Sequence, residues 1–176
     1  MITRYTPKEE IIAKGKYPCN DCTHCCKFGS GYLAEGDLEN IAAHIKISVQ
    51  ELKDIYLEQG EKFNTKAYRP KSPKPFGPCI FLGLHGCTIE PVKPLNCRTG
   101  NCGKESAELQ KWFDANHFLQ LNDPESIRQY ALYLEFNTPL PGASLGEIIP
   151  DKAKLKAILS YHGGQDEPKK DTVPKG

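Results

Sequence analysis

The sequence predicts a mainly α-helical fold, a small irregular single domain in which short helices pack around a cysteine cluster core. The chain has 176 residues, which is the size of one ordinary domain. Its apolar residues recur at helical spacing over short segments that glycine and proline interrupt. Its eight cysteines fall into two groups, four within residues 19–26 and four within residues 79–102. We therefore expect short helices to hold these two groups together.

Three helices are expected before residue 60. The first starts at Thr6 and Pro7, which suit the cap and the first helical position. The second spans residues 37–45. Its buried stripe would consist of Leu38, Ile41, Ala42 and Ile45. The third begins at Ser48, which can form a capping box with Glu51. Its buried face would consist of Val49, Leu52, Ile55 and Tyr56.

The middle of the chain is expected to lack helices. Prolines recur between Glu61 and Pro78, and proline excludes a regular helix, so this basic stretch is predicted to be an extended connector. The apolar run from Cys79 to Leu84 follows it. A run this short predicts either a strand or a buried turn.

Three further helices are expected after the second cysteine group, over residues 104–116, 124–137 and 151–161. Their aromatic residues suit a packed core better than a cofactor cage. These residues are Trp112, Phe113, Phe118, Tyr130, Tyr133 and Phe136. Residues 1–164 would then form the domain, and residues 165–176, which are poor in large apolar side chains, a disordered tail.

The cysteines carry the chemistry. The first group is Cys19, Cys22, Cys25 and Cys26, and the second is Cys79, Cys87, Cys97 and Cys102. Cysteines two residues apart can converge on one ion or cluster through a tight turn, so the first group is a strong metal signal. Adjacent side chains point in different directions, so Cys25 and Cys26 are not expected to share one metal ion. The second group could complete sites that the first begins, and the predicted core is therefore metal-centred.

The number of metal sites stays open at this point. Eight thiolates can fill two sites of four ligands each, with either zinc or iron–sulfur cubanes. The alternative partition has one cluster and leaves the other thiols as a redox pair or as ligands of a labile metal.

Arg98 is the one residue other than cysteine that we assign to the site, as a cofactor-binding residue. Its guanidinium follows Cys97 directly, where it could offset the charge of an anionic cluster or make an ordinary surface salt bridge. His24 and His85 also lie near cysteines, but we expect solvated loop histidines there because the cysteines already fill two sites. The spacing reveals no catalytic residue.

These motifs resemble the CxxCxxCC family, which includes the YkgJ-like proteins and is described as zinc- or iron-chelating. The matching pieces are Cys19 to Cys26, Cys79-Ile-Phe-Leu with Gly86-Cys87-Thr-Ile, and Pro94-Leu-Asn-Cys97-Arg98. The family's third element usually reads Arg-Pro-x2-Cys-Arg, so Lys93 is a basic-for-basic change. Cys102 is an addition to the family pattern. The resemblance implies metal chelation.

The first hypothesis for function is the binding of one or two iron–sulfur clusters, of the 4Fe–4S type, for electron transfer or redox sensing. The dense first cysteine group is more typical of cluster ligation than of separated zinc knuckles. The alternative is structural zinc in an interaction module. A third hypothesis is an iron–sulfur-dependent enzyme of unknown substrate, such as an oxidoreductase component.

Composition limits the partners. The net charge is +1 with basic and acidic residues interleaved, so no surface for nucleic acid is expected. No apolar stretch approaches the roughly 18–20 residues that span a bilayer, and the N-terminus lacks the apolar region of a secretion signal. We therefore expect a cytoplasmic protein, with a redox protein as its partner under the first hypothesis. The sequence does not indicate an oligomeric state.

Overall fold

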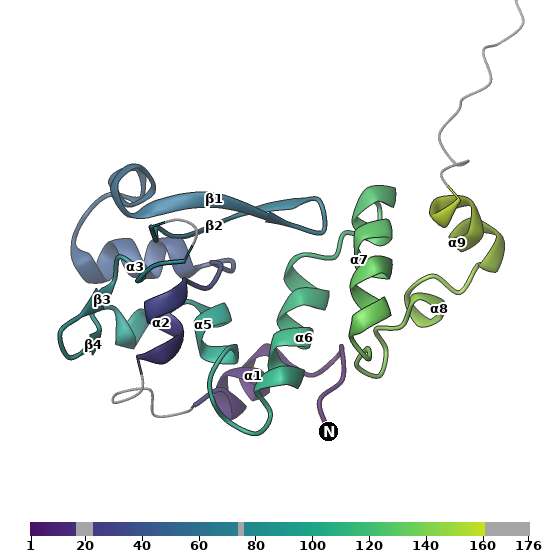
Figure 1. Ribbon diagram of the computed structural model, residues 1–176, viewed down its shortest axis with the longest axis horizontal. Helices are drawn as coiled ribbons and strands as arrows, with labels where there is room; N and C mark the ends of the chain where they lie inside the picture. Colours follow the sequence, from purple (N-terminus) through teal and green to yellow (C-terminus); the bar gives the residue numbers. More distant parts are fainter. Residues whose placement is uncertain (17–22, 74–75, 161–176) are drawn as a thin grey trace, which may run out of the picture.

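The computed structural model describes residues 1–16, 23–73 and 76–160 of the chain. Helices predominate in these residues, and two short antiparallel hairpins accompany them (Figure 1). The predicted mainly α-helical class is confirmed. None of the described helices is both long enough and apolar enough to cross a membrane. The predicted tail over residues 165–176 lies outside the described residues.

The helices early in the chain follow their local signals. They are α1 (Lys8–Lys14), α2 (His24–Phe28), α3 (Asp37–Ile45) and α4 (Val49–Glu51). Pro7 is the cap of α1, so that helix begins about one residue later than predicted. In α3, Ile41 and Ala42 are buried as predicted. The Ser48 hydroxyl accepts the Glu51 N–H at 3.1 Å and the Glu51 carboxylate accepts the Ser48 N–H at 2.8 Å, which confirms the capping box.

The segment after α4 corrects one predicted buried face. The chain continues there as a π-helical turn, η1 (Leu52–Tyr56). Leu52 is fully buried, but Ile55 is 55% exposed, so the predicted burial of Ile55 is wrong. A π-helical turn is wider than an α-helical turn, and the side chains that follow Leu52 therefore leave the α-helical stripe.

The predicted connector is also partly wrong, because its first half forms a hairpin. Strand β1 (Leu57–Lys62) pairs with β2 (Thr65–Pro70) in antiparallel register, with Lys62 opposite Thr65. The turn residues Phe63 and Asn64 both have left-handed backbone angles, with φ of 49° and 56°. Left-handed angles at both turn residues suit the right-handed twist of the strands. The prolines do exclude a helix, as predicted, but they begin only where β2 ends.

Short elements follow in the region of the second cysteine group. They are β3 (Leu82–Gly83), β4 (Gly86–Cys87), η2 (Glu90–Val92) and α5 (Leu95–Thr99). The run from Cys79 to Leu84 therefore ends in a short strand, one of its two predicted forms. Phe81 is buried within it, whereas Leu84 is 94% exposed in the turn. The sequence analysis did not predict α2, η2 or α5.

The helices of the last third confirm the predicted ones within about two residues. They are α6 (Ser106–His117), α7 (Pro124–Phe136), α8 (Leu145–Ile148) and α9 (Lys152–Leu159), of which α8 was not predicted. Trp112, Phe113, Phe118 and Tyr130 are buried as expected, and Tyr133 packs against them. Phe136 is 86% exposed, so its assignment to the core is wrong. It is the last residue of α7, where the packing ends.

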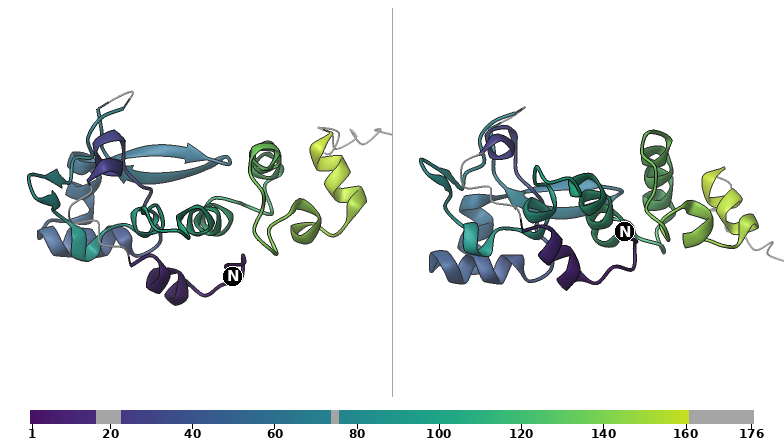
Figure 2. Two further views of the ribbon diagram at one scale, coloured as in Figure 1. Left: turned by 60° about the horizontal axis from the view of Figure 1, so that its bottom comes forward. Right: turned by 90° about the horizontal axis from the view of Figure 1, so that it is seen from below.

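The described elements are spread along one long axis (Figure 1). Helices α2, α3 and α5 and the β3–β4 hairpin gather at one end, α1 and α6 lie in the middle, and α7 to α9 lie at the other end (Figure 1). Figure 2 shows the same order from two further sides. Two apolar clusters underlie this arrangement, one around α6 and α7 and one around α3 and η1.

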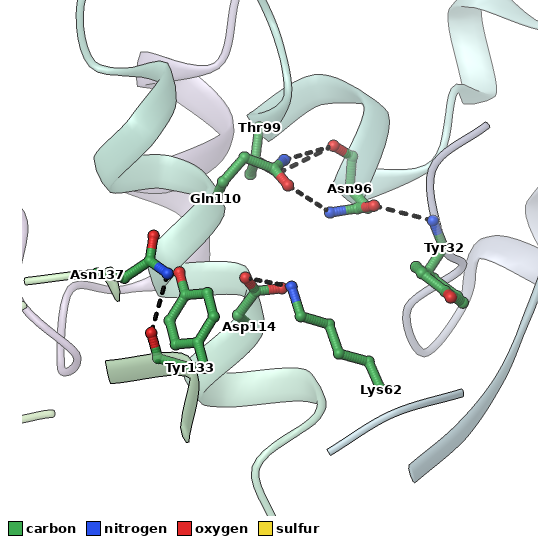
Figure 3. Close-up of polar contacts among 8 residues, drawn as sticks. All are labelled: Tyr32, Lys62, Asn96, Thr99, Gln110, Asp114, Tyr133 and Asn137. Carbon is green, nitrogen blue, oxygen red and sulfur yellow. Dashed lines mark hydrogen bonds and ion pairs between the residues drawn. The ribbon is translucent and has the colours of Figure 1, made fainter. Parts of the chain in front are cut away.

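The β1–β2 hairpin joins the two clusters. Leu57 at the start of β1 belongs to the cluster around α3, and Phe63 at the hairpin tip belongs to the cluster around α6 and α7. The Phe63 ring packs edge-on against Tyr130 and Tyr133, with centroids 5.3 and 5.4 Å away. Next to it, the Lys62 ammonium lies 2.6 Å from the buried Asp114 carboxylate (Figure 3). The hairpin therefore holds the cysteine-bearing end to the rest of the fold.

The ion pair gives a test of this connection. Burial raises the pKa of Asp114 and the Lys62 ammonium lowers it. In K62M the carboxyl group loses its cation, and its pKa rises further above the unfolded value. At low pH the buried Asp114 carboxyl group of the variant is neutral and costs no stability. As the pH rises through the folded pKa of Asp114, the group ionises without a partner and the variant loses stability. We expect K62M to lose roughly 2 kcal/mol at pH 7, below the 3–5 of a fully buried pair because Lys62 is partly exposed.

Urea unfolding at pH 7 and pH 5 measures this effect. The loss should be smaller at pH 5, and K66M on the solvent-exposed part of β2 should change little at either pH. An equal loss for K62M at both pH values would contradict this account of the ion pair.

Candidate metal centre

One cavity collects all the cysteines that the structure describes. Its volume is about 340 Å³, and it lies between α2, the β3–β4 hairpin and α5. The cysteines in its wall are Cys25, Cys26, Cys79, Cys87, Cys97 and Cys102. Cys19 and Cys22 lie outside the described residues. The two sequence-distant groups therefore meet at one place, as far as the described members show.

Helix α2 and the second cysteine group are joined through the backbone. The Cys26 carbonyl accepts the Cys79 N–H at 2.7 Å. Cys25 faces another part of the chain, since its Sγ lies 3.8 Å from the Gly100 carbonyl oxygen. Neighbouring side chains on a helix are separated by about 100° of rotation, so the two thiols diverge from one another.

The β3–β4 hairpin and the residues just before it present two cysteines to the cavity. The Leu82 N–H donates to the Cys79 carbonyl at 2.8 Å, and Leu82 pairs with Cys87 across the hairpin. Buried Phe81 and Ile89 anchor this segment in the apolar cluster around α3. Cys79 and Cys87 pack on the edge of the same cluster, which holds them on the cavity wall.

Helix α5 carries Cys97 and is held from two sides. At its start, the Asp37 carboxylate accepts the N–H groups of Leu95 at 3.1 Å and of Ala34 at 2.7 Å. Near its end, Asn101 donates to the Gly15 carbonyl at 3.3 Å and to the Arg98 carbonyl at 2.8 Å. The contact with Gly15 holds the residues that precede the first cysteine group against the end of α5.

A close backbone approach places Cys97. A Cβ atom at Gly31 would lie 2.6 Å from Cys97 Sγ, far inside contact distance. The Gly31 N–H donates to the Cys97 sulfur. The adjoining Tyr32 N–H donates to Asn96 Oδ1 at 2.9 Å. The loop after α2 and the start of α5 are thus packed backbone to backbone, which only glycine permits at this position.

A side-chain amide network supports this approach from behind (Figure 3). Asn96 Nδ2 donates to Gln110 Oε1 at 3.2 Å, and Gln110 Nε2 donates to the Asn96 carbonyl at 3.0 Å. Gln110 Nε2 also donates to Thr99 Oγ1 at 2.7 Å. Gln110 belongs to α6, so the network joins α5 to the longer helix behind it. Asn96 and Gln110 both line the cavity, and the sequence analysis named neither.

Burial keeps two of the thiols protonated at neutral pH. Burial raises the pKa of Cys79 to about 11, and negative charge on Cys26 or Cys87 raises it as well. Burial raises the pKa of Cys97 to about 12, against the lowering effects of the Gly31 N–H and the Lys93 ammonium. A metal must therefore displace protons from both thiols when it binds.

Lys93, rather than Arg98, supplies the cation in the cavity wall. The Lys93 side chain is 8% exposed, and its ammonium lies 3.3 Å from the Glu90 carboxylate, which also lines the cavity. Arg98 donates to the carbonyls of Lys93 at 2.9 Å and of Pro91 at 3.1 Å, and the cavity lining does not include it. Contact between Arg98 and a cofactor stays a prediction. His24 and His85 both line the cavity.

The metal-ligating side chains that the structure describes are not arranged to coordinate a single ion. Within residues 1–16, 23–73 and 76–160, no three histidine, cysteine, aspartate or glutamate side chains stand close enough to hold one metal ion. The same thiols nevertheless surround one cavity and influence each other's pKa.

Comparison with known proteins gives one match. The family model CxxCxxCC, described as a putative zinc- or iron-chelating domain, matches residues 18–117, which is more than half of the chain and includes every cysteine. No curated protein and no solved structure matches the chain.

Two glycines of the cavity wall provide a matched test of the close approach. G31A would drive its methyl group into Cys97, so we expect it to bind at least tenfold less metal per chain than the unaltered protein. G29A is the control, because a Cβ atom at Gly29 meets nothing within 4 Å. Metal analysis with circular dichroism on both variants measures the effect. Equal metal content in the two folded variants would contradict the proposed role of Gly31.

Proposed function

Because this chain belongs to the CxxCxxCC family of putative zinc- or iron-chelating domains, we propose that its cysteines bind an iron–sulfur cluster of the 4Fe–4S type, in electron transfer or redox sensing. The observation that carries this proposal is a cavity of about 340 Å³ whose wall contains all six cysteines that the structure describes. Thiolate sulfur is the ligand that zinc, Cu(I) and iron–sulfur clusters prefer, so the donor set fits these metals.

The spacing of the thiols favours a cluster over a single ion. Four sulfurs on one zinc ion, with Zn–S near 2.3 Å, would stand only about 3.8 Å from each other. Among the described residues no three donors are gathered in this way. A cluster of several atoms needs a cavity with several cysteines in its wall, and the described residues supply one.

The surroundings suit an anionic cluster. A cluster held by thiolates carries net negative charge, and hydrogen bonds to its sulfurs tune its potential. The Gly31 N–H already donates to the Cys97 sulfur, and the buried Lys93 ammonium lowers the pKa of that thiol. These two groups would stabilise the charged form of the site.

The position of the cavity suits electron transfer or redox sensing. Cys25 and Cys102 are exposed, so the centre lies near the surface, where a redox protein could approach. A cytoplasmic location would keep the thiols reduced and available for the cluster.

Structural zinc is the second candidate. The family description names zinc beside iron. The cysteines in the cavity wall come from α2, the β3–β4 hairpin and α5, so an ion bound to them would connect these elements. In that case the zinc ion would only stabilise the fold, and the chain would function as an interaction module.

Metal and sulfide analysis distinguishes the two candidates. We expect anaerobically purified protein to be brown, with broad visible absorption, and to contain iron and acid-labile sulfide in equal amounts. Removal of the iron with a chelator should abolish the colour. Colourless protein that contains zinc and no sulfide would exclude the iron–sulfur proposal and favour structural zinc.

A further inference from the structure

Three exposed apolar side chains belong to the segments that form the cavity wall. Phe28 of α2 lines the cavity and is 57% exposed. Ile80 and Leu84 are exposed in the run that leads through β3 to the tip of the β3–β4 hairpin. We refer to these three residues as the apolar rim. Large apolar side chains that are exposed beside a cavity are typical of a surface that another molecule covers.

The cavity is open to solvent beside the apolar rim. His24 and His85 are exposed, and both line the cavity. The His24 ring packs against the Phe28 ring with centroids 5.1 Å apart, and His85 directly follows Leu84 in the hairpin tip. Two exposed cysteines belong to the same wall. A molecule that binds the apolar rim would therefore lie close to the thiols.

Positive charge predominates in the parts of the sequence that contain the cysteines. Residues 17–31 and 71–104 include all eight cysteines, six basic residues and two acidic ones. The net charge of the whole chain is only +1, so acidic residues outnumber basic ones in the rest of it. The charge of the chain is therefore unevenly distributed, with its positive part at the cysteine site.

Two lysines add exposed positive charge beside the apolar rim. Lys27 belongs to α2, and Lys104 lies two residues after Cys102. Among the residues that the structure describes, neither lysine forms an ion pair with a carboxylate. Glu90, an acidic residue of the cavity wall, lies 3.3 Å from Lys93 and so does not offset them. A negatively charged partner fits such a surface.

An apolar rim with lysines beside it suits a brief complex between two redox proteins. Electron-transfer complexes are small and weak, and apolar contact at their centre excludes water. Complementary charges at the edge speed the encounter and orient the two proteins. The partner that fits is therefore a protein with carboxylates around an apolar surface at which its own cofactor lies.

We propose that the apolar rim, together with Lys27 and Lys104, docks an acidic redox protein that exchanges electrons with the cluster. This inference rests on the proposed function and adds to it the docking surface and the charge of the partner. In the complex, one electron passes from the reduced partner to the oxidised cluster. The partner is oxidised by one electron and the cluster is reduced by one, while no bond forms or breaks and no proton moves.

Titration with two acidic electron carriers tests the docking surface. The probes are a flavodoxin and a plant-type 2Fe–2S ferredoxin, both oxidised, and the full chain is purified anaerobically. Isothermal titration calorimetry measures the Kd. For the unaltered chain we expect binding that weakens about tenfold between roughly 20 mM and roughly 200 mM salt, because salt screens the attraction between exposed charges. This part of the test does not depend on any variant.

Variants of the surface should weaken the same binding. We expect K27E/K104E to raise the Kd about tenfold, because two attractions become repulsions. We expect L84S to raise it about fivefold, because apolar contact with the partner is lost. Leu84 lies in an exposed turn, so this substitution leaves the packing of the fold intact.

Matched controls at the other end of the fold separate the surface from overall charge. K152E/K154E on α9 reverses two exposed lysines and so changes the net charge by the same amount. F136S on α7 removes a side chain that is nearly as exposed as Leu84. Both helices lie far along the long axis from α2 and the β3–β4 hairpin (Figure 1). We expect each control to change the Kd by less than about twofold.

Several results would overturn the docking surface. Equal weakening in K27E/K104E and K152E/K154E would show that net charge alone acts, and unchanged affinity in L84S would remove the apolar rim from the interface. Iron and sulfide are measured on every sample. Cluster-containing protein that binds neither probe would overturn the docking surface alone, whereas protein without iron and sulfide would overturn the proposed function as well. Rim-dependent binding to phosphatidylserine vesicles, with none to either probe, would assign the surface to a membrane instead.

Discussion

The structure of the cysteine site depends on the close approach of Gly31 to Cys97. Two backbones meet there with no room for a side chain, and the Gly31 N–H donates to the cysteine sulfur. This contact brings the loop after α2 to α5 and so joins the two sequence-distant cysteine groups. The amide network of Asn96 and Gln110 holds the approach from the side of α6.

The rest of the fold supplies a rigid frame for this contact. One apolar cluster anchors the β3–β4 hairpin and the other anchors α6, while the β1–β2 hairpin reaches from one cluster to the other. Burial within this frame raises the pKa of Cys79 and of Cys97, so it is energetically unfavourable to form the thiolates that would bind a metal. A bound cation would offset that cost, and this links metal binding to the stability of the fold.

Local signals explain what could be predicted from the sequence. The capping box at Ser48 and the proline at the start of α7 act within a few residues, and these helices lie where they were expected. The β1–β2 hairpin was missed because its turn, Phe63-Asn64, contains no glycine to mark it. Helices α2 and α5 have five residues each, and such short helices depend on tertiary packing rather than on their own sequence. Likewise, only the fold shows that Lys93 rather than Arg98 lines the cavity.

The central claim is that the cysteine-walled cavity holds a metal centre ligated by thiolates. X-ray absorption at the edge of the bound metal, on protein as purified under anaerobic conditions, tests it most directly. The account predicts a first shell of sulfur alone at about 2.3 Å, with metal–metal scattering beyond it if the centre is a cluster. A first shell dominated by nitrogen or oxygen would contradict it.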